Sequence, residues 1–370
     1  MNIVQARSPF IVTVPYSTDP NNTEGYITFR GSTGVEGAGA GEQIVFTKPN
    51  TGTMVWNMSN FIREFIIGSN QLLVQVPTFT DQLDYCYFTI ERGYVSDGEM
   101  QEPISTTEYV GMDGYTNYDS GGLNIDDGIE GFSVLSYTYY KDFIAGTYPP
   151  FFEIITNEGG CDTLTITYTQ TVPTSVTVTR TLYMSTNKTI KIPYTLYPFD
   201  GRFVGNVSIT IRAYIGSDLY NSYTTNTYPA EECKYSPYMV QFVNRNGGWN
   251  TLTFYKASRE SMSVTNSDFQ VSPVFDVNGY YDPYQPQFKT FNTNAKKRIK
   301  LNTGWINEEN VQEIEDMLLS ERLFVVTPTF GQYPSKIVTS NMEFKKTVNE
   351  KMINYELEFE FAYNVINDVV

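Results

Sequence analysis

The strongest constraint on the fold is a strict alternation of apolar and polar side chains in the middle of the chain. In TLTITYTQ, residues 163–170, Leu164, Ile166 and Tyr168 take every second position, and threonines fill the positions between them. Successive side chains of a strand point to opposite faces, so this run predicts a strand with one apolar and one polar face. Three further runs alternate in the same way, at residues 174–184, 189–198 and 206–216. The pattern is typical of antiparallel sheets with one face in water, at the spacing of a β-sandwich.

Two segments depart from the strand pattern and predict helices. In NMSNFIREFIIG, residues 57–68, apolar side chains recur at helical spacing, and Asn57 or Ser59 is the expected N-cap. Near the C-terminus, Asn307 is the expected N-cap of a second helix over residues 308–322, which carries an apolar stripe. Strand-like runs surround both segments, so each helix is expected to pack on a sheet.

From these elements we predict a mainly β protein of tandem β-sandwich domains, whose C-terminal β domain carries one packed α-helix. The length of 370 residues suits three such domains. We expect an N-terminal β-sandwich with one short helix in residues 1–115, a second β-sandwich with a Tyr/Gly-rich entry loop in 116–235, and the C-terminal domain with helix 308–322 in 236–370.

The lack of histidine in the sequence narrows the range of functions most. It removes the commonest general base, the usual catalytic metal ligand and every Ser-His or Cys-His pair. The three cysteines, Cys86, Cys161 and Cys233, match neither a zinc site nor a disulfide framework, and we interpret them as buried free thiols. Adjacent carboxylates such as Asp126 and Asp127 diverge in strands and helices, so a glycosidase ranks last. We therefore expect no enzyme, with no catalytic residues, no cofactor and no metal.

The charge and the N-terminus bear on partners and location. The formal net charge is −16 at pH 7, which argues against nucleic-acid binding because that function needs a concentrated basic face. The first residues, MNIVQARSPFIVTVPY, fit neither a signal peptide nor a transmembrane helix. We expect synthesis in a cytoplasm and no membrane partner.

Residues 96–131 change character, because Gly, Asp, Ser and Tyr replace the alternating apolar residues. The segment predicts a long surface loop that offers Tyr115 and Tyr118 to a partner, since tyrosine brings a large contact area at low entropy cost. Part of it faintly resembles a calcium loop, but it lacks the glycine and the glutamate which that loop requires. We therefore favour a surface loop for a partner over a calcium-binding loop.

One basic run stands out in this acidic chain. In KKRIK, residues 296–300, strand geometry projects Lys296, Arg298 and Lys300 to one side. The run is either a solvated strand face with salt bridges to acidic neighbours, or an edge strand that docks on another subunit.

The three tryptophans, Trp56, Trp249 and Trp305, each lie beside a turn or at the end of an element. Filling of the core or of a domain interface is the simpler interpretation. Anchoring of contacts between subunits is the alternative, because Trp and Tyr dominate interface hot spots.

Four stretches, in order along the chain, carry a resemblance to a known group of proteins. They are RSPFIVTVPY followed by TMVWNMSNFIREFI, then YFTIERGYVSDGE, then FVNRNGGWNTLTFYKASRESMSV, and last KRIKLNTGWINEENVQEIEDMLLSERLFVV. With them the chain resembles virion structural proteins, of the tail or tail tip, from tailed phages and prophages of Bacteroidetes-type hosts. The four stretches span much of both ends of the chain, whereas the middle third shares only its β-rich character. Trp56 and Asn57 depart from the usual apolar-acidic pair before the family's first helix.

The resemblance implies a structural subunit, either a tail or tail-tip component or a ring-forming subunit, that forms homo-oligomers and binds other virion structural proteins. It places the protein in the virion, after assembly in the host cytoplasm, and offers no catalytic residues. It also implies that the hairpin at 242–261 is an assembly surface, in which Asn244, Arg245, Gly247 and Trp249 shape a turn that packs within or between subunits.

The alternative is a carbohydrate- or receptor-binding β-sandwich module of the virion. Its surface tyrosines would stack on the sugar rings of a host surface glycan or receptor. Such a module would gather its aromatic residues on one exposed face, whereas an assembly subunit would bury them at subunit contacts.

Overall fold

A computed structural model describes residues 2–33, 42–66, 79–81, 85–117, 132–134, 152–156, 162–183, 194–196, 203–229, 234–272, 275, 277–280, 283–307, 311–329, 331–339 and 352–366. It confirms a mainly β fold of antiparallel sheets in sandwich-like domains. The chain divides into two compact units. The first unit comprises Met1–Glu232, Gln241–Thr253 and Glu309–Glu321, and the second comprises Cys233–Val240, Phe254–Glu308 and Arg322–Val370. The first two predicted domains therefore share one unit, which also contains part of the third.

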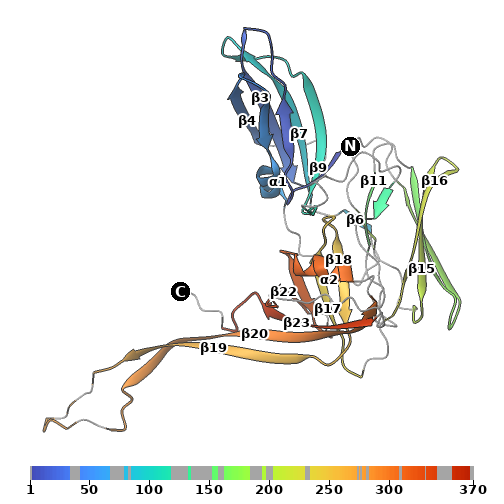
Figure 1. Cartoon of the computed structure of the whole chain (residues 1–370). Helices are drawn as coiled ribbons and strands as arrows, with labels where there is room; N and C mark the ends of the chain where they lie inside the picture. The colour runs from blue at the N-terminus through green and yellow to red at the C-terminus, as the bar shows by residue number, and fades with distance from the viewer. Residues whose placement is uncertain are drawn as a thin grey trace. The chain divides into compact units, whose positions relative to one another are not determined.

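The N-terminal part of the first unit is a two-layer sandwich. Its larger sheet has the order β1-β9-β7-β3-β4, with β8 beside β7. Figure 1 shows β9, β7, β3 and β4 of this sheet. These strands are β1 (Asn2–Gln5), β3 (Asn22–Thr33), β4 (Glu42–Pro49), β7 (Tyr85–Ser96), β8 (Glu99–Met100) and β9 (Ser105–Met112). The second layer pairs β2 (Ile11–Val14) with β5 (Met54–Asn57). Phe29 and Phe88 from the large sheet pack against Val12 and Trp56 from the small one in a single buried cluster.

A short helix, α1 (Ser59–Phe65), follows β5 and confirms the helix predicted within residues 57–68. Its N-cap is Met58 rather than Asn57 or Ser59. The Asn57 Oδ1 atom instead accepts hydrogen bonds from the backbone N–H groups of Phe10 and Ser59, each at 3.2 Å. These bonds fasten the start of the helix to the chain that leads into β2.

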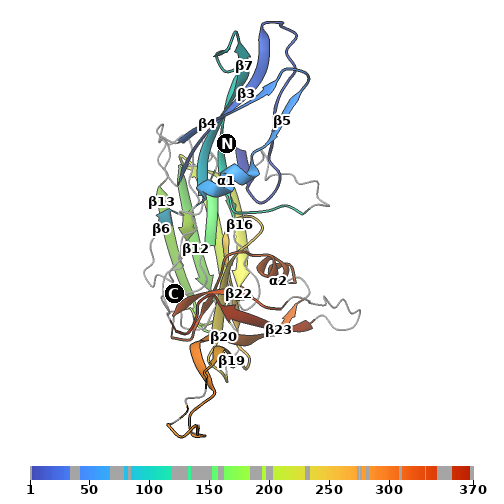
Figure 2. The ribbon, with the colours of Figure 1, turned by 90° about the vertical axis from the view of Figure 1, so that its left-hand side faces the viewer.

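Two further sheets belong to the first unit. One has the order β10-β11-β14-β6, with β6 (Phe79–Asp81), β10 (Phe132–Val134), β11 (Phe152–Thr156) and β14 (Tyr194–Leu196). The other has the order β13-β12-β15-β16, with β12 (Thr163–Gln170), β13 (Val176–Tyr183), β15 (Val207–Ile215) and β16 (Asp218–Thr227). Figure 2 shows β12 beside β13 in the latter. The alternation that predicted these strands is confirmed, because Leu164, Ile166 and Tyr168 are buried and the threonines between them are partly exposed.

The second unit is built on a sheet in which β21 (Leu323–Val326), β22 (Gln332–Ile337), β23 (Met352–Phe361), β20 (Phe288–Asn307) and β19 (Arg259–Gln270) follow one another. Every adjacent pair of these strands is antiparallel. In β23, Tyr355, Leu357 and Phe359 are buried. These side chains alternate along the strand with Glu356 and Glu358, which are more exposed.

The hairpin predicted at residues 242–261 corresponds to β17 (Tyr238–Val243), β18 (Trp249–Phe254) and the turn between them. The second helix, α2, spans Val311–Leu318 and lies in the first unit with the turn of this hairpin. It is shorter than the predicted 308–322 at its C-terminal end, where the Ser320 N–H donates to the Met317 carbonyl and closes the last turn. Residues 308–310 lie outside the described part of the chain.

Candidate assembly surface

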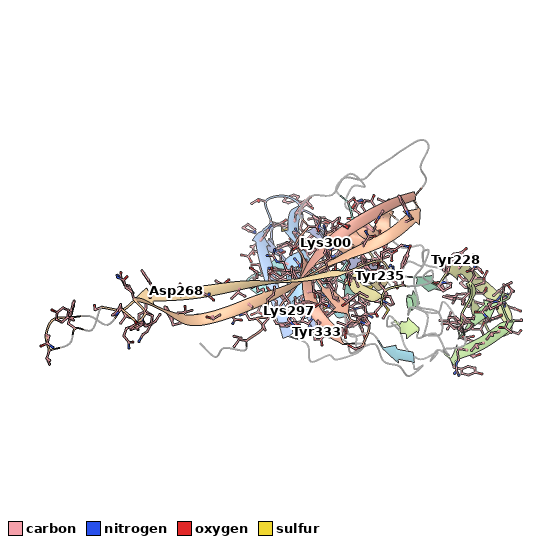
Figure 3. The ribbon with its side chains drawn as sticks, turned by 90° about the horizontal axis from the view of Figure 1, so that it is seen from below. Tyr228, Tyr235, Asp268, Lys297, Lys300 and Tyr333 are labelled. Atoms are coloured by element: carbon pink, nitrogen blue, oxygen red, sulfur yellow. The ribbon has the colours of Figure 1, made fainter. Side chains whose placement is uncertain are left out.

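A two-stranded ribbon is the most exposed element of the second unit. β20 pairs with β23 only from Asn307 to Arg298, but it continues to pair with β19 as far as Phe288. We call residues 261–297 the arm: the parts of β19 and β20 beyond β23, and the segment that joins them (Figure 1). In Figure 3, Asp268 lies far along the arm and Lys297 lies near its root. Among the strands that the structure describes, none pairs with β19 and β20 in this part of the ribbon apart from their partnership with each other.

Large apolar side chains line the arm although few of its residues are buried. Eleven of the twelve residues of β19 are exposed, and so are Phe288 (61% exposed) and Phe291 (52%) of β20. The exposed large apolar side chains of the arm are Met262, Val264, Phe269, Phe275, Val277, Tyr280, Tyr284, Phe288 and Phe291. Exposed apolar residues are normal when they are scattered, but a continuous group of this size marks an interaction surface.

Both faces of the arm carry apolar side chains. Met262 and Val264 share one face, because they are two residues apart in β19. Past a bulge between Thr265 and Ser267, Phe269 lies on the opposite face of β19 and packs edge-on against Phe291, with ring centroids 5.7 Å apart. A ribbon that faced only water would be expected to present at least one polar face.

The root of the arm is fastened by residues that follow β23. The Val365 N–H donates to the Ala295 carbonyl at 2.8 Å. Asn294 donates from Nδ2 to the Ile366 carbonyl at 3.0 Å and accepts from the Ile366 N–H at 3.2 Å. These bonds anchor the arm to its own sheet at its root.

The predicted basic face lies where the arm joins the sheet. Arg298 Nε is 2.8 Å from Glu360 Oε2, Lys336 Nζ is 3.0 Å from Glu360 Oε1, and Lys296 Nζ is 3.5 Å from the same oxygen. The hydrogen bond from Lys336, followed by that from Arg298, lowers the pKa of Glu360 to about 2. Lys300 Nζ lies 2.6 Å from Glu356 Oε2. This side of β20 therefore pairs with acidic neighbours of its own unit, one of the two interpretations of the run.

Lys297 projects to the other side of β20 and is exposed (Figure 3). Its cross-strand neighbour is Met262. Within the described part of the chain Lys297 forms no ion pair, so it adds an available positive charge beside the apolar residues of the arm.

The turn at Asn244 packs inside the first unit. Asn244 is buried, and its Oδ1 accepts from the N–H groups of Asn246 (2.9 Å) and Gly248 (3.1 Å) while its Nδ2 donates to Asn250 Oδ1 (2.7 Å). Gly247 has φ +84°, and a Cβ there would lie 2.8 Å from the Cβ of Met112. The turn is therefore built by close backbone approach within the subunit.

Residues of this turn meet two acidic side chains of α2 that the sequence did not single out. Asp316 accepts hydrogen bonds from the Tyr115 hydroxyl (3.2 Å) and the Arg245 N–H (3.3 Å), and the Arg245 guanidinium lies 3.4 Å away. Glu313 is fully buried and accepts from Asn250 Nδ2 at 3.2 Å. Burial raises the pKa of both carboxyls, that of Glu313 to about 8.

This polar cluster joins the β17–β18 turn, α2 and Tyr115 by direct hydrogen bonds. No group of three or more potential metal ligands occurs among the residues that the structure describes. Its only sequence signal is that Glu313 and Asp316 are three positions apart in a helix, which puts both on one side.

The remaining predicted interface residues differ in exposure. Trp249 is fully buried and Trp56 is nearly so, with the Lys48 ammonium 5.1 Å from the centre of the Trp56 ring. Both fill the interior of the first unit. Trp305 is half exposed, Tyr115 is half buried under the Arg7 guanidinium, and Tyr118 lies outside the described residues. Of the cysteines, only Cys86 is among the described residues, and it is a buried free thiol.

Comparisons with known proteins add little to this picture. No family model and no curated protein matches the sequence. The solved structures that are similar include two titled calcium-binding domain CBD12 of CALX1.1 and CBD12 from CALX1.2. Both are 10% identical over 58% of this chain with a TM-score of 0.17, and 78% and 79% of their own chains are covered. No helix within the described ranges is both long and apolar enough to cross a membrane.

Proposed function

We propose that the protein is a structural subunit of a tailed-phage virion, in the tail or tail tip, that works by oligomeric assembly. The observation that carries this proposal is the arm. An isolated two-stranded ribbon is only marginally stable in water, and three or more strands or a packed face are needed for independent stability. A second copy laid along the arm would supply that face and cover its apolar side chains.

Charge is compatible with a second copy as the partner. The arm, residues 261–297, contains three basic and three acidic residues, a net charge of zero in a chain of net charge −16. The arm therefore lacks the net negative charge that would repel another acidic subunit. On the basis of the resemblance to virion proteins, we place this assembly in a virion, where other virion structural proteins are further partners.

A test compares the native chain with a variant whose arm is shortened. Replacing residues 266–293 by Asn-Gly keeps the cross-strand pair of Thr265 and Asn294, and Asn-Gly suits a two-residue hairpin turn. Light scattering at two salt concentrations should give a defined oligomer for the native chain and the monomer mass for the variant. A native chain that stays at 42.1 kDa would contradict self-assembly. An oligomer of unchanged mass in the variant would contradict the role of the arm.

A second candidate function, binding of a host surface glycan, is favoured by a different part of the molecule. Tyr183 at the edge of the β13-β12-β15-β16 sheet is 80% exposed. An exposed tyrosine on a flat sheet can stack on a sugar ring. This function and assembly are compatible in one virion protein.

A further inference from the structure

The polar face of the β13-β12-β15-β16 sheet is a regular array of hydroxyl groups. Cross-strand register places one residue from each strand in the same row. The three rows are Thr177-Thr169-Ser208-Asn226, Thr179-Thr167-Thr210-Thr224 and Thr181-Thr165-Arg212-Ser222. Ten of these twelve side chains end in a hydroxyl group. We call this surface the hydroxyl face.

The array has a fixed repeat. Neighbouring strands lie about 4.8 Å apart, and residues two apart along a strand are separated by roughly 6.7 Å. In the middle row, the Oγ1 atoms of Thr167 and Thr179 are 3.3 Å apart, and Thr224 Oγ1 donates to Thr210 Oγ1 at 3.3 Å. These four hydroxyls therefore form two hydrogen-bonded pairs, both longer than an ordinary O–H···O bond. They still have capacity for a ligand, because each hydroxyl can donate once and accept twice.

The hydroxyl face is rigid. The opposite sides of β12 and β15 are buried, and they include Ile166, Ile209 and Ile211, each fully enclosed. Threonine is β-branched, which restricts its χ1 angle, so little rotamer entropy is lost when a ligand binds. The outer strand β13 leaves Thr177, Thr179 and Thr181 exposed.

The face is almost uncharged although the chain is acidic. Arg212 is the single charged residue of the three rows, and none of the twelve is Asp or Glu. An anionic ligand would find one cation here, and a cationic ligand would find no partner. A neutral ligand rich in hydroxyl groups matches this surface best.

Aromatic side chains border the array at one end. The next row contains Tyr183, Thr163, Tyr214 and Leu219 in register across the four strands. Tyr183 is strongly exposed and Tyr214 partly so. Aromatic rings beside hydrogen-bonding groups offer a sugar both stacking and hydrogen bonds, since pyranose rings have apolar faces and polar edges.

We propose that the hydroxyl face binds a neutral polysaccharide, with Tyr183 stacking on a sugar ring and the threonine rows bonding to its hydroxyls. The inference gives the second candidate function a site and a ligand class. It rests on that candidate function and is independent of the arm, so it can fail while the assembly proposal stands.

Affinity electrophoresis through gels containing dextran, mannan or mixed-linkage β-glucan tests the inference, with polygalacturonate as an anionic comparison. Two variants address the site: Tyr183→Ala, and the pair Thr167→Val with Thr210→Val. Valine keeps the shape and the strand preference of threonine but removes its hydroxyl group. Thr106→Val, at an exposed threonine of β9 in another sheet, is the matched control.

At least one neutral polysaccharide should retard the native protein, and both site variants should bind it about tenfold more weakly while Thr106→Val binds normally. No retardation by any of the three neutral gels would overturn the inference. Equal retardation by polygalacturonate, or unchanged binding by the site variants, would also overturn it. Light scattering on the same variants gives an independent readout: loss of the oligomer with no effect on sugars would make this face a subunit contact instead.

Discussion

Replacing Glu313 by glutamine should stabilise the first unit at neutral pH and have little effect at acid pH. Glu313 is fully buried on α2, and burial raises its pKa from an ordinary 4.5 to about 8. In the folded chain the carboxyl therefore holds its proton at pH values where the unfolded chain has released it. The unfolded state binds fewer protons across this interval, so the free energy of unfolding must fall as the pH rises from 4.5 to 8.

The magnitude follows from the size of the interval. Between pH 4.5 and pH 7 the folded carboxyl stays largely protonated, and each pH unit is worth 1.36 kcal/mol, which gives a loss of about 3 kcal/mol. Glu313→Gln keeps a side-chain oxygen for the hydrogen bond from Asn250 and has no proton to lose. Its free energy of unfolding should exceed that of the native chain by a margin that grows with pH.

Urea unfolding at several pH values between 4.5 and 8 measures this margin. A Trp305→Phe background leaves Trp56 and Trp249 as the fluorescent reporters, and both belong to the first unit. Glu108→Gln, at an exposed carboxyl of β9, is the matched control and should show no such trend. A margin for Glu313→Gln that stays constant with pH, or a variant less stable than the native chain at pH 7, would refute the reasoning.

Three further predictions concern the arm, the turn and the basic face. Phe288→Ser with Phe291→Ser should lower the oligomer mass in light scattering without altering the unfolding transition, since covering each half-exposed ring contributes about 1 kcal/mol to association. Gly247→Ala should lower the unfolding free energy by at least about 2 kcal/mol, whereas Gly98→Ala, with φ +82° and open space around it, should cost about 1 kcal/mol. Glu360→Gln should reduce the loss of second-unit stability at acid pH. The lowered pKa of Glu360 contributes to the free energy of unfolding, and this contribution is lost as the pH falls from 4.5 towards 2. Near-UV circular dichroism as a function of pH measures this loss. The same acid unfolding transition in the variant and the native chain would contradict the prediction.

Much of the fold could be predicted because burial imposes a local period on the sequence. Leu164, Ile166 and Tyr168 alternate in sequence, and all three are buried in the structure. The apolar stripe of residues 57–68 likewise predicted α1, whose Ile62 is fully enclosed. In these segments the polarity of each side chain predicts whether it faces the core or the solvent.

The features that depend on distant parts of the chain could not be predicted in this way. The resemblance implied that Asn244 and Arg245 shape a turn that packs within or between subunits, and it left these alternatives open. The structure shows that Gly247 approaches Met112 closely, which holds the turn within the first unit. The polar cluster around Asp316 involves residues as far apart in sequence as Tyr115 and Asp316. Local periodicity carries no information on such pairs.

The arm escaped prediction for a related reason. Its strand β19, RESMSVTNSDFQ, has no consistent apolar face, and eleven of its twelve residues are exposed among the residues that the structure describes. The basic run 296–300 did mark the root of the arm, since those residues pair with β23 on one side. A strand whose packing partner is another molecule need not show the period of a core strand.

Cryo-electron microscopy of the purified oligomer tests the central claim most directly, because it shows what covers the arm. Our account predicts a closed ring in which the arm of each copy lies on its neighbour, with Phe288 and Phe291 buried at the contact. An oligomer in which the arms project freely into solvent, joined through other surfaces, would contradict it.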